Sequence, residues 1–108
     1  MKMQATITGS KLHGVGYRAF LLNQAFNAGM QRFYARNLKR DELQQVIVRV
    51  EGESNQIESF SACIRKEHPP DAVVSDITFQ EYTGYVTSIH EYWQMRMVEL
   101  LTQAFPLF

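Results

Sequence analysis

The sequence contains a single cysteine, Cys63, so it has neither a disulfide framework nor the thiolate set of a zinc site. Its 108 residues hold no apolar run near the roughly 18 residues of a membrane span, and the first residues lack the apolar stretch of a secretory signal. The chain also has no excess of positive or negative charge, because 11 Lys and Arg balance 11 Asp and Glu. This balance argues against a nucleic-acid module with a basic face. We therefore expect a soluble, cytoplasmic single domain without a membrane role.

The order of apolar patterns predicts the fold. Hydrophobic residues make up 45% of the chain and charged residues 20%, which is typical of a globular domain. Alternating apolar positions predict strands, and apolar positions at helical spacing predict helices. The expected strands cover residues 3–8, 33–38, 46–50 and 73–81, and the expected helices cover residues 18–27 and the segment around 57–64. This order matches an α+β, ferredoxin-like βαββαβ sandwich, with two helices on one face of an antiparallel sheet.

The C-terminal part of the chain permits two interpretations. Residues 92–98 alternate between apolar and polar, which predicts an additional C-terminal strand, although residues 91–102 can also be drawn as a helix. We expect the domain to span residues 1–98 and to leave an apolar tail at 99–108 that packs on the domain or on a neighbour. The protein would then be a monomer or a weak oligomer through the tail. The large apolar residues of the tail are Leu100, Leu101, Phe105, Leu107 and Phe108.

A segment rich in glycine, His13-Gly14-Val15-Gly16-Tyr17-Arg18, lies between the first strand and the first helix. Glycines let backbone N–H groups approach an anion closely, and the N-terminus of the following helix favours negative charge. Arg18 adds a planar fork of donors that matches phosphate oxygens. The alternative is an ordinary turn followed by a solvated arginine, and the local pattern alone leaves both open.

Asn37 lies near the end of the second predicted strand. In a split βαβ unit the first two strands run parallel, so their C-terminal ends lie at the same edge of the sheet. Asn37 can therefore reach the neighbourhood of the glycine-rich segment and Arg18. A carboxamide carries both a donor and an acceptor, which is what orienting a water molecule requires. The alternative is a turn residue that bonds its own backbone.

Several segments together resemble the acylphosphatase family. Residues 14–20, GVGYRAF, are similar to its glycine-rich loop, often written VQGVGFRxF, and residues 35–38, ARNL, are similar to its second motif. Residues 69–74, PPDAVV, follow its PPxAxV segment, and residues 93–97 resemble its closing strand. The resemblance covers about residues 3–97. His13 stands where the family usually has glutamine. The interval from Gly9 to Gly14 and the interval from Arg18 to Asn37 are each about one residue longer than in the family pattern.

The resemblance implies an enzyme that hydrolyses acyl phosphates to a carboxylate and inorganic phosphate, with no cofactor, no metal and no phosphoenzyme. The implied partners are the small-molecule acyl phosphate and its phosphate product, and not nucleic acid. Asn37 would orient the attacking water as a catalytic residue, and Arg18 would act both in catalysis and in phosphate binding. The remaining phosphate-binding groups would be the loop amides of His13, Gly14, Val15, Gly16 and Tyr17.

Two other functions are compatible with the same fold. The longer spans around the loop favour an anion-binding module with weak or no catalysis. An RNA-binding sheet would need exposed aromatic residues on its central strands and a basic face, which the valines of residues 46–50 and the neutral charge disfavour. His13, His68 and His90 have no metal-ligand spacing, and we expect Cys63 to be a small buried apolar residue rather than a nucleophile.

Overall fold

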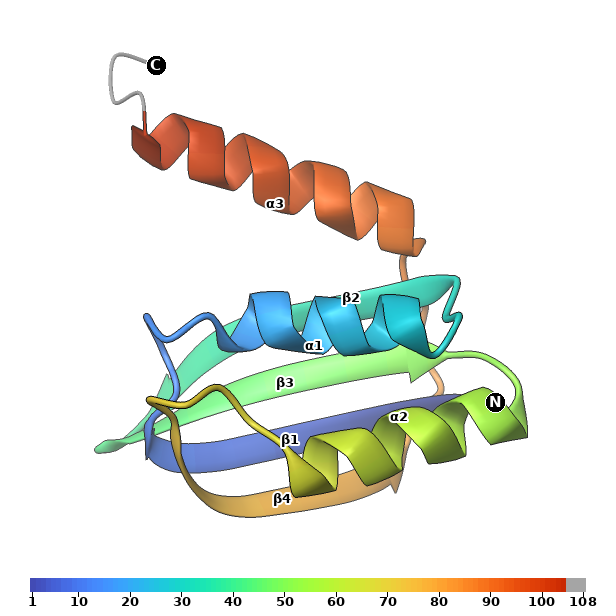
Figure 1. The fold of residues 1–108 in the computed structure, drawn as a ribbon, viewed down its shortest axis with the longest axis horizontal. Helices are drawn as coiled ribbons and strands as arrows, with labels where there is room; N and C mark the ends of the chain where they lie inside the picture. Colours follow the sequence, from blue (N-terminus) through green and yellow to red (C-terminus); the bar gives the residue numbers. More distant parts are fainter. Residues whose placement is uncertain (105–108) are drawn as a thin grey trace.

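The computed structural model describes residues 1–104 and confirms the ferredoxin-like βαββαβ core. The four strands form one antiparallel sheet in the order β2-β3-β1-β4. Helices α1 and α2 cover one face of this sheet, and a third helix, α3, lies beside its β2 edge (Figure 1). In chain order the elements are β1 (Lys2–Lys11), α1 (Tyr17–Asn27), β2 (Arg32–Arg40), β3 (Leu43–Glu51), α2 (Ser54–Lys66), β4 (Val73–Glu81) and α3 (Ile89–Ala104).

The hydrophobic core lies between the sheet and the two covering helices. Alternate residues of β1 and β3 point into it, because side chains of a strand alternate between the two faces of a sheet. Helix α2 presents a stripe of Ile57, Phe60 and Ile64, as its helical spacing predicts. The buried strand residues that face the helices include Met3, Ala5, Ile7, Val46, Val48 and Val50.

Strand β1 is longer than predicted. It runs through Gly9 to Lys11, beyond the predicted end at residue 8. The pairing of β1 with β4 shifts register on both sides of Gly9, so this residue sits at a bulge. A β-carbon on Gly9 would lie 2.0 Å from the carbonyl oxygen of Val73, which explains why a glycine stands inside the strand.

The predicted additional C-terminal strand is wrong, because residues 92–98 lie within α3. The chain pairs with the edge of β2 only briefly, through a bridge between Ser88 and Arg32. It then turns into a helix that packs one face, through Ile89 and Tyr92, against the domain. The alternating apolar residues that suggested a strand are instead exposed on the helix: Trp93, Met95 and Met97.

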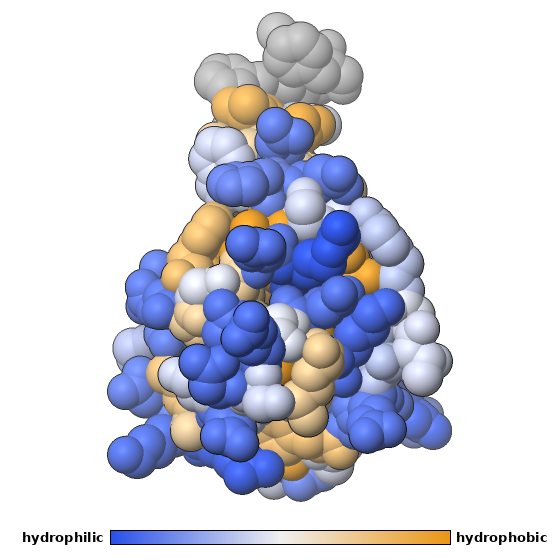
Figure 2. All heavy atoms as spheres, turned by 90° about the vertical axis from the view of Figure 1, so that its right-hand side faces the viewer, coloured by the Kyte–Doolittle hydropathy of each residue, from blue (hydrophilic) through white to orange (hydrophobic). Residues whose placement is uncertain are grey.

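Residues 99–104 of the predicted tail continue α3, and Leu100 and Leu101 are exposed rather than packed on the domain. In Figure 2, apolar side chains gather at the upper end of the molecule, near the end of α3, above a more polar body. Phe105, Leu107 and Phe108 lie outside the described residues. Within residues 1–104, no helix combines the length and apolarity needed to cross a membrane.

Candidate active site

The segment between β1 and α1 contains two glycines in a backbone conformation that other residues rarely adopt. Gly14 and Gly16 have φ angles of 74° and 78°, in the left-handed region where side chains with a β-carbon are strained. Gly16 is the N-cap of α1, and no side chain caps this end of the helix within the described part of the chain. The N–H groups of the first turn, which have no partner inside a helix, are therefore available to an anion.

The structure brings Arg18 and Asn37 to one cavity, as the sequence predicts. Strands β1 and β2 both pair antiparallel with β3, so they run parallel and end at the same edge of the sheet. Arg18 comes from the first turn of α1 and Asn37 from β2. The cavity has a volume of about 290 Å³ and is lined by Leu12, Gly14, Gly16, Tyr17, Arg18, Ala19, Asn37, Arg96 and Gln103.

The carboxamide of Asn37 has an unused acceptor. Its Oδ1 atom is buried and has no hydrogen-bond partner among residues 1–104. Asn37 lies within β2, opposite Val46 of β3, and not in a turn. A buried polar atom without a partner costs free energy, and a water or ligand oxygen in the cavity would remove that cost.

The guanidinium of Arg18 faces a carboxylate that was not predicted to lie at the site. Its Nη1 lies 3.7 Å from Oε1 of Glu99, and Nη1 of Arg96 lies 3.2 Å from Oε2 of the same carboxylate. Arg96, Glu99 and the cavity residue Gln103 all belong to α3. The signal that could have found them is the helical reading of residues 91–102, because that reading puts the three residues on one face, about a turn apart.

His13 and Val15 do not line this cavity. The backbone N–H of His13 was predicted to bind phosphate, but it donates to Oε1 of Gln44 at 2.8 Å. The imidazole is also held, since its Nε2 donates to the carbonyl of Gln45 at 2.9 Å. The main-chain groups that remain at the cavity belong to Gly14, Gly16 and the first turn of α1.

Two buried tyrosines support the site. Tyr17 packs edge-to-face against Phe20, with ring centroids 5.9 Å apart, so it steadies the start of α1. Burial raises the pKa of Tyr17 to about 12. Burial also raises the pKa of Tyr92, although the nearby Arg18 and Arg96 oppose the shift. Both phenols are therefore neutral near pH 7 and do not serve as bases.

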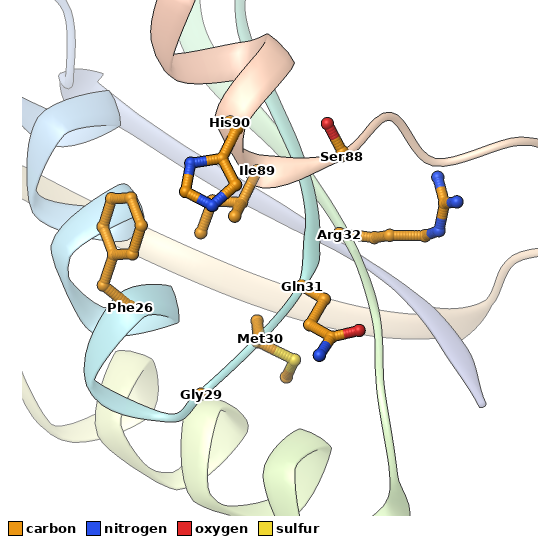
Figure 3. Close-up of a pocket in the computed structure, with 8 residues that line it drawn as sticks. All are labelled: Phe26, Gly29, Met30, Gln31, Arg32, Ser88, Ile89 and His90. Atoms are coloured by element: carbon orange, nitrogen blue, oxygen red, sulfur yellow. The ribbon is translucent and has the colours of Figure 1, made fainter.

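A larger cavity, of about 560 Å³, lies between the end of α1 and the start of α3. Its labelled side chains do not converge on one point (Figure 3). Arg32 extends away from Phe26 and His90 in this view, and its Nη1 donates to the carbonyl of Val86. This cavity therefore presents no group of donors arranged around an anion.

The remaining candidate residues stay apart from the site. Cys63 is half-buried, not buried as expected, and its thiol donates to Oε1 of Gln24 at 2.8 Å. Burial raises the pKa of this thiol, and Glu67 adds to the shift, so the group is a poor nucleophile. His68 lies in the loop after α2. The described residues contain no cluster of three potential metal ligands.

Comparison with known proteins gives one family and several similar structures. The profile of the Acylphosphatase family matches residues 3–91. The crystal structure of acylphosphatase from Bacillus subtilis is 25% identical, with a TM-score of 0.59 over 79% of this chain and 89% of that one. Full-length HypF, in its phosphate- and nucleotide-bound form, is 28% identical with a TM-score of 0.66, over 77% of this chain but 10% of HypF.

An acylphosphatase from Coxiella burnetii shares the fold, with 18% identity and a TM-score of 0.55 over 78% of this chain and 82% of that one. No match was found among the curated proteins. The family match and these structures cover the βαββαβ core, while the end of α3, with Arg96, Glu99 and Gln103, lies beyond the residues that the family profile matches.

Proposed function

Because this chain belongs to the acylphosphatase family, we propose that it hydrolyses acyl phosphates to a carboxylate and inorganic phosphate, with Arg18 and Asn37 as its catalytic residues. One observation carries the proposal: Arg18, Asn37 and the two glycines with positive φ line the same small cavity. Guanidinium, backbone N–H and carboxamide groups are the donors and acceptors that phosphoryl transfer to water requires.

In the proposed mechanism the phosphoryl oxygens bind Arg18 and the amides at Gly14, Gly16 and Tyr17. Asn37 holds a water in line with the bond to be broken, and its buried Oδ1 accepts a hydrogen bond from that water. The water oxygen forms a bond to phosphorus while the bond from phosphorus to the carboxyl oxygen breaks. The proton of the water passes to a phosphoryl oxygen.

The leaving group explains why so small a site is sufficient. The conjugate acid of a carboxylate has a pKa of about 4, so the carboxylate departs without a general acid. Positioning of the water and stabilisation of charge on the phosphoryl oxygens are then the main tasks of the protein. We expect chelating agents to leave turnover unchanged, since the proposed mechanism uses no metal.

The test is hydrolysis of benzoyl phosphate by purified protein. We expect Arg18→Ala to lower kcat/KM by at least about 10²-fold, as for loss of a key charge-stabilising donor. Asn37→Ala should lower kcat more than it weakens phosphate binding. Arg36→Ala is the matched control, because Arg36 precedes Asn37 in β2 but is exposed. Full turnover by Arg18→Ala would refute the assignment.

An anion-binding module with little catalysis is the second candidate function. Two contacts favour weak catalysis: the backbone N–H of His13 is already bound to Gln44, and the Glu99 carboxylate lies 3.7 Å from the guanidinium of Arg18. Calorimetric titration with inorganic phosphate separates the two functions. Phosphate binding without hydrolysis of benzoyl or acetyl phosphate would favour the binding module, while turnover that depends on Arg18 would favour the enzyme.

A further inference from the structure

Helix α3 carries a second guanidinium to the candidate active site. Arg96 lines the cavity together with Arg18 and Asn37. In Figure 1, α3 runs back across the molecule, toward the side where the loop between β1 and α1 enters α1. The side chains of Arg96 and Arg18 are 19% and 22% exposed, whereas that of Glu99, which lies between them, is 45% exposed.

The two guanidiniums share one anion, the carboxylate of Glu99. Its two oxygens face them separately, at 3.7 Å from Arg18 and 3.2 Å from Arg96. Two like charges that lie close together repel each other unless an anion lies between them. A carboxylate and a phosphoryl group both present oxygens that a guanidinium fork can bind. The guanidiniums of Arg18 and Arg96 can therefore hold an anion between them.

The ion pairs are not required to hold α3 in place. Tyr92 is nearly fully buried and packs against Phe33 and Tyr34, with ring centroids 5.0 Å and 6.1 Å away. The backbone N–H of Ile89 also donates to the carbonyl of Gln31 at 2.9 Å. Partly exposed ion pairs contribute only about 0–1 kcal/mol to stability. The anchoring of α3 is thus explained without Arg96 and Glu99.

We propose that Arg96 is a second substrate-binding guanidinium and that Glu99 is an internal anion, which the phosphoryl group of the substrate displaces from Arg18 and Arg96. This inference rests on the proposed function, since it assigns further residues to the same site. It has two consequences of opposite sign. Loss of Arg96 weakens phosphate binding, and loss of the charge on Glu99 strengthens it.

The experiment measures the Kd of inorganic phosphate by calorimetry, and KM and kcat for benzoyl phosphate, for the full chain. We expect Arg96→Gln to raise both Kd and KM about 10-fold, as for loss of one charge-assisted contact, with a smaller change in kcat. Glu99→Gln should lower Kd several-fold. Arg96→Lys keeps the charge without the fork and should fall between Arg96→Gln and the unchanged protein.

Arg36→Gln is the control for the loss of one positive charge, and it should leave Kd and KM unchanged. Thermal unfolding of each variant shows whether it is folded. A purely structural role for the ion pairs would change Tm and leave Kd unchanged in both Arg96→Gln and Glu99→Gln, and that result would overturn the inference. If Arg96→Gln fails to fold, an unchanged or weaker phosphate affinity in Glu99→Gln also overturns it.

The two proposals fail in distinguishable ways. If the protein binds phosphate and Arg96→Gln weakens that binding, but no acyl phosphate is hydrolysed, only the proposed enzymatic function fails. If Arg18→Ala abolishes hydrolysis while Arg96→Gln binds phosphate normally, only this inference fails. If the unchanged protein neither binds phosphate nor hydrolyses acyl phosphates, both fail.

Discussion

Oε1 of Gln44 accepts a hydrogen bond of 2.8 Å from the backbone N–H of His13. The same oxygen accepts a second bond, of 2.7 Å, from the N–H of Leu12. A side chain of β3 therefore fixes the segment that leads into the glycine-rich loop, although it lies far from that segment in sequence. Because Leu12 and Gly14 both line the cavity, Gln44 acts on the candidate active site as a positioning residue.

We predict that Gln44→Ala weakens substrate binding through this loop. The substitution leaves two partly buried N–H groups without their partner, which costs about 1–3 kcal/mol per group. The loop then samples other conformations, so KM for benzoyl phosphate should rise severalfold while the chemical step in bound substrate changes less. Gln45→Ala is the control, since the Gln45 side chain bonds Thr8 instead of the loop. An unchanged KM in Gln44→Ala would show that the loop does not need this contact.

A second prediction concerns the bulge of β1. Gly9→Ala would place a β-carbon 2.0 Å from the carbonyl oxygen of Val73, a backbone atom that cannot move aside without shifting β4. We expect a loss of about 1–3 kcal/mol in the free energy of unfolding, as for other overpacked sites. Urea denaturation followed by circular dichroism measures it. Ser10→Ala, at the exposed next position of β1, should change stability by less than about 0.5 kcal/mol.

The core of the fold could be predicted from sequence because its signals are local and repeated. Alternation in β1 and β3 and the stripe of α2 reflect burial of one face, and burial is what stabilises these elements. The meeting of Arg18 and Asn37 followed from strand direction alone, which the order of elements determines. The end of β1 could not be predicted, because the close approach of β4 to Gly9 depends on packing between distant segments.

The C-terminal helix was mispredicted for a physical reason. Residues 92–98 satisfy both a strand and a helix pattern, and only tertiary contacts decide between them. In the structure this segment is helical, Tyr92 packs on Phe33 and Tyr34, and Trp93 is exposed. Because residues 92–98 were expected to form a strand, the proximity of Arg96 and Glu99 to Arg18 was also missed. The contacts of Gln44 with the loop carried no sequence signal at all.

A third prediction follows from the raised pKa of Tyr17. Below pH 10 the phenol is neutral in both folded and unfolded chains, so stability does not depend on its ionisation. Between pH 10 and about 12 the unfolded chain ionises at this residue while the folded chain does not, so stability falls as pH rises. Because the pKa of Tyr17 is raised from 10.0 to about 12, the free energy of unfolding falls by about 2–3 kcal/mol in total over this range.

Tyr17→Phe should remove this part of the alkaline loss, which urea denaturation between pH 8 and 11.5 would measure. Near pH 7 the variant should be about 1 kcal/mol more stable, because the hydroxyl of Tyr17 is buried without a hydrogen-bond partner among the described residues. Tyr85→Phe is the control, since Tyr85 is 70% exposed. A pH dependence identical to that of the unchanged protein would show that Tyr17 ionises as easily in the folded state.

The last prediction concerns the packing of α3 against the core. Tyr92→Ala removes an aromatic ring that is 3% exposed and contacts Phe33 and Tyr34, and we expect a loss of about 3–5 kcal/mol. Trp93→Ala, on the same helix but 46% exposed, should cost far less. Trp93 is the single tryptophan, so its emission in Tyr92→Ala reports on α3 alone. If α3 separates before the core unfolds, the emission changes at a lower urea concentration than the main transition of the far-ultraviolet circular dichroism. Coincident transitions would show instead that α3 and the core unfold as one unit, as in a two-state domain.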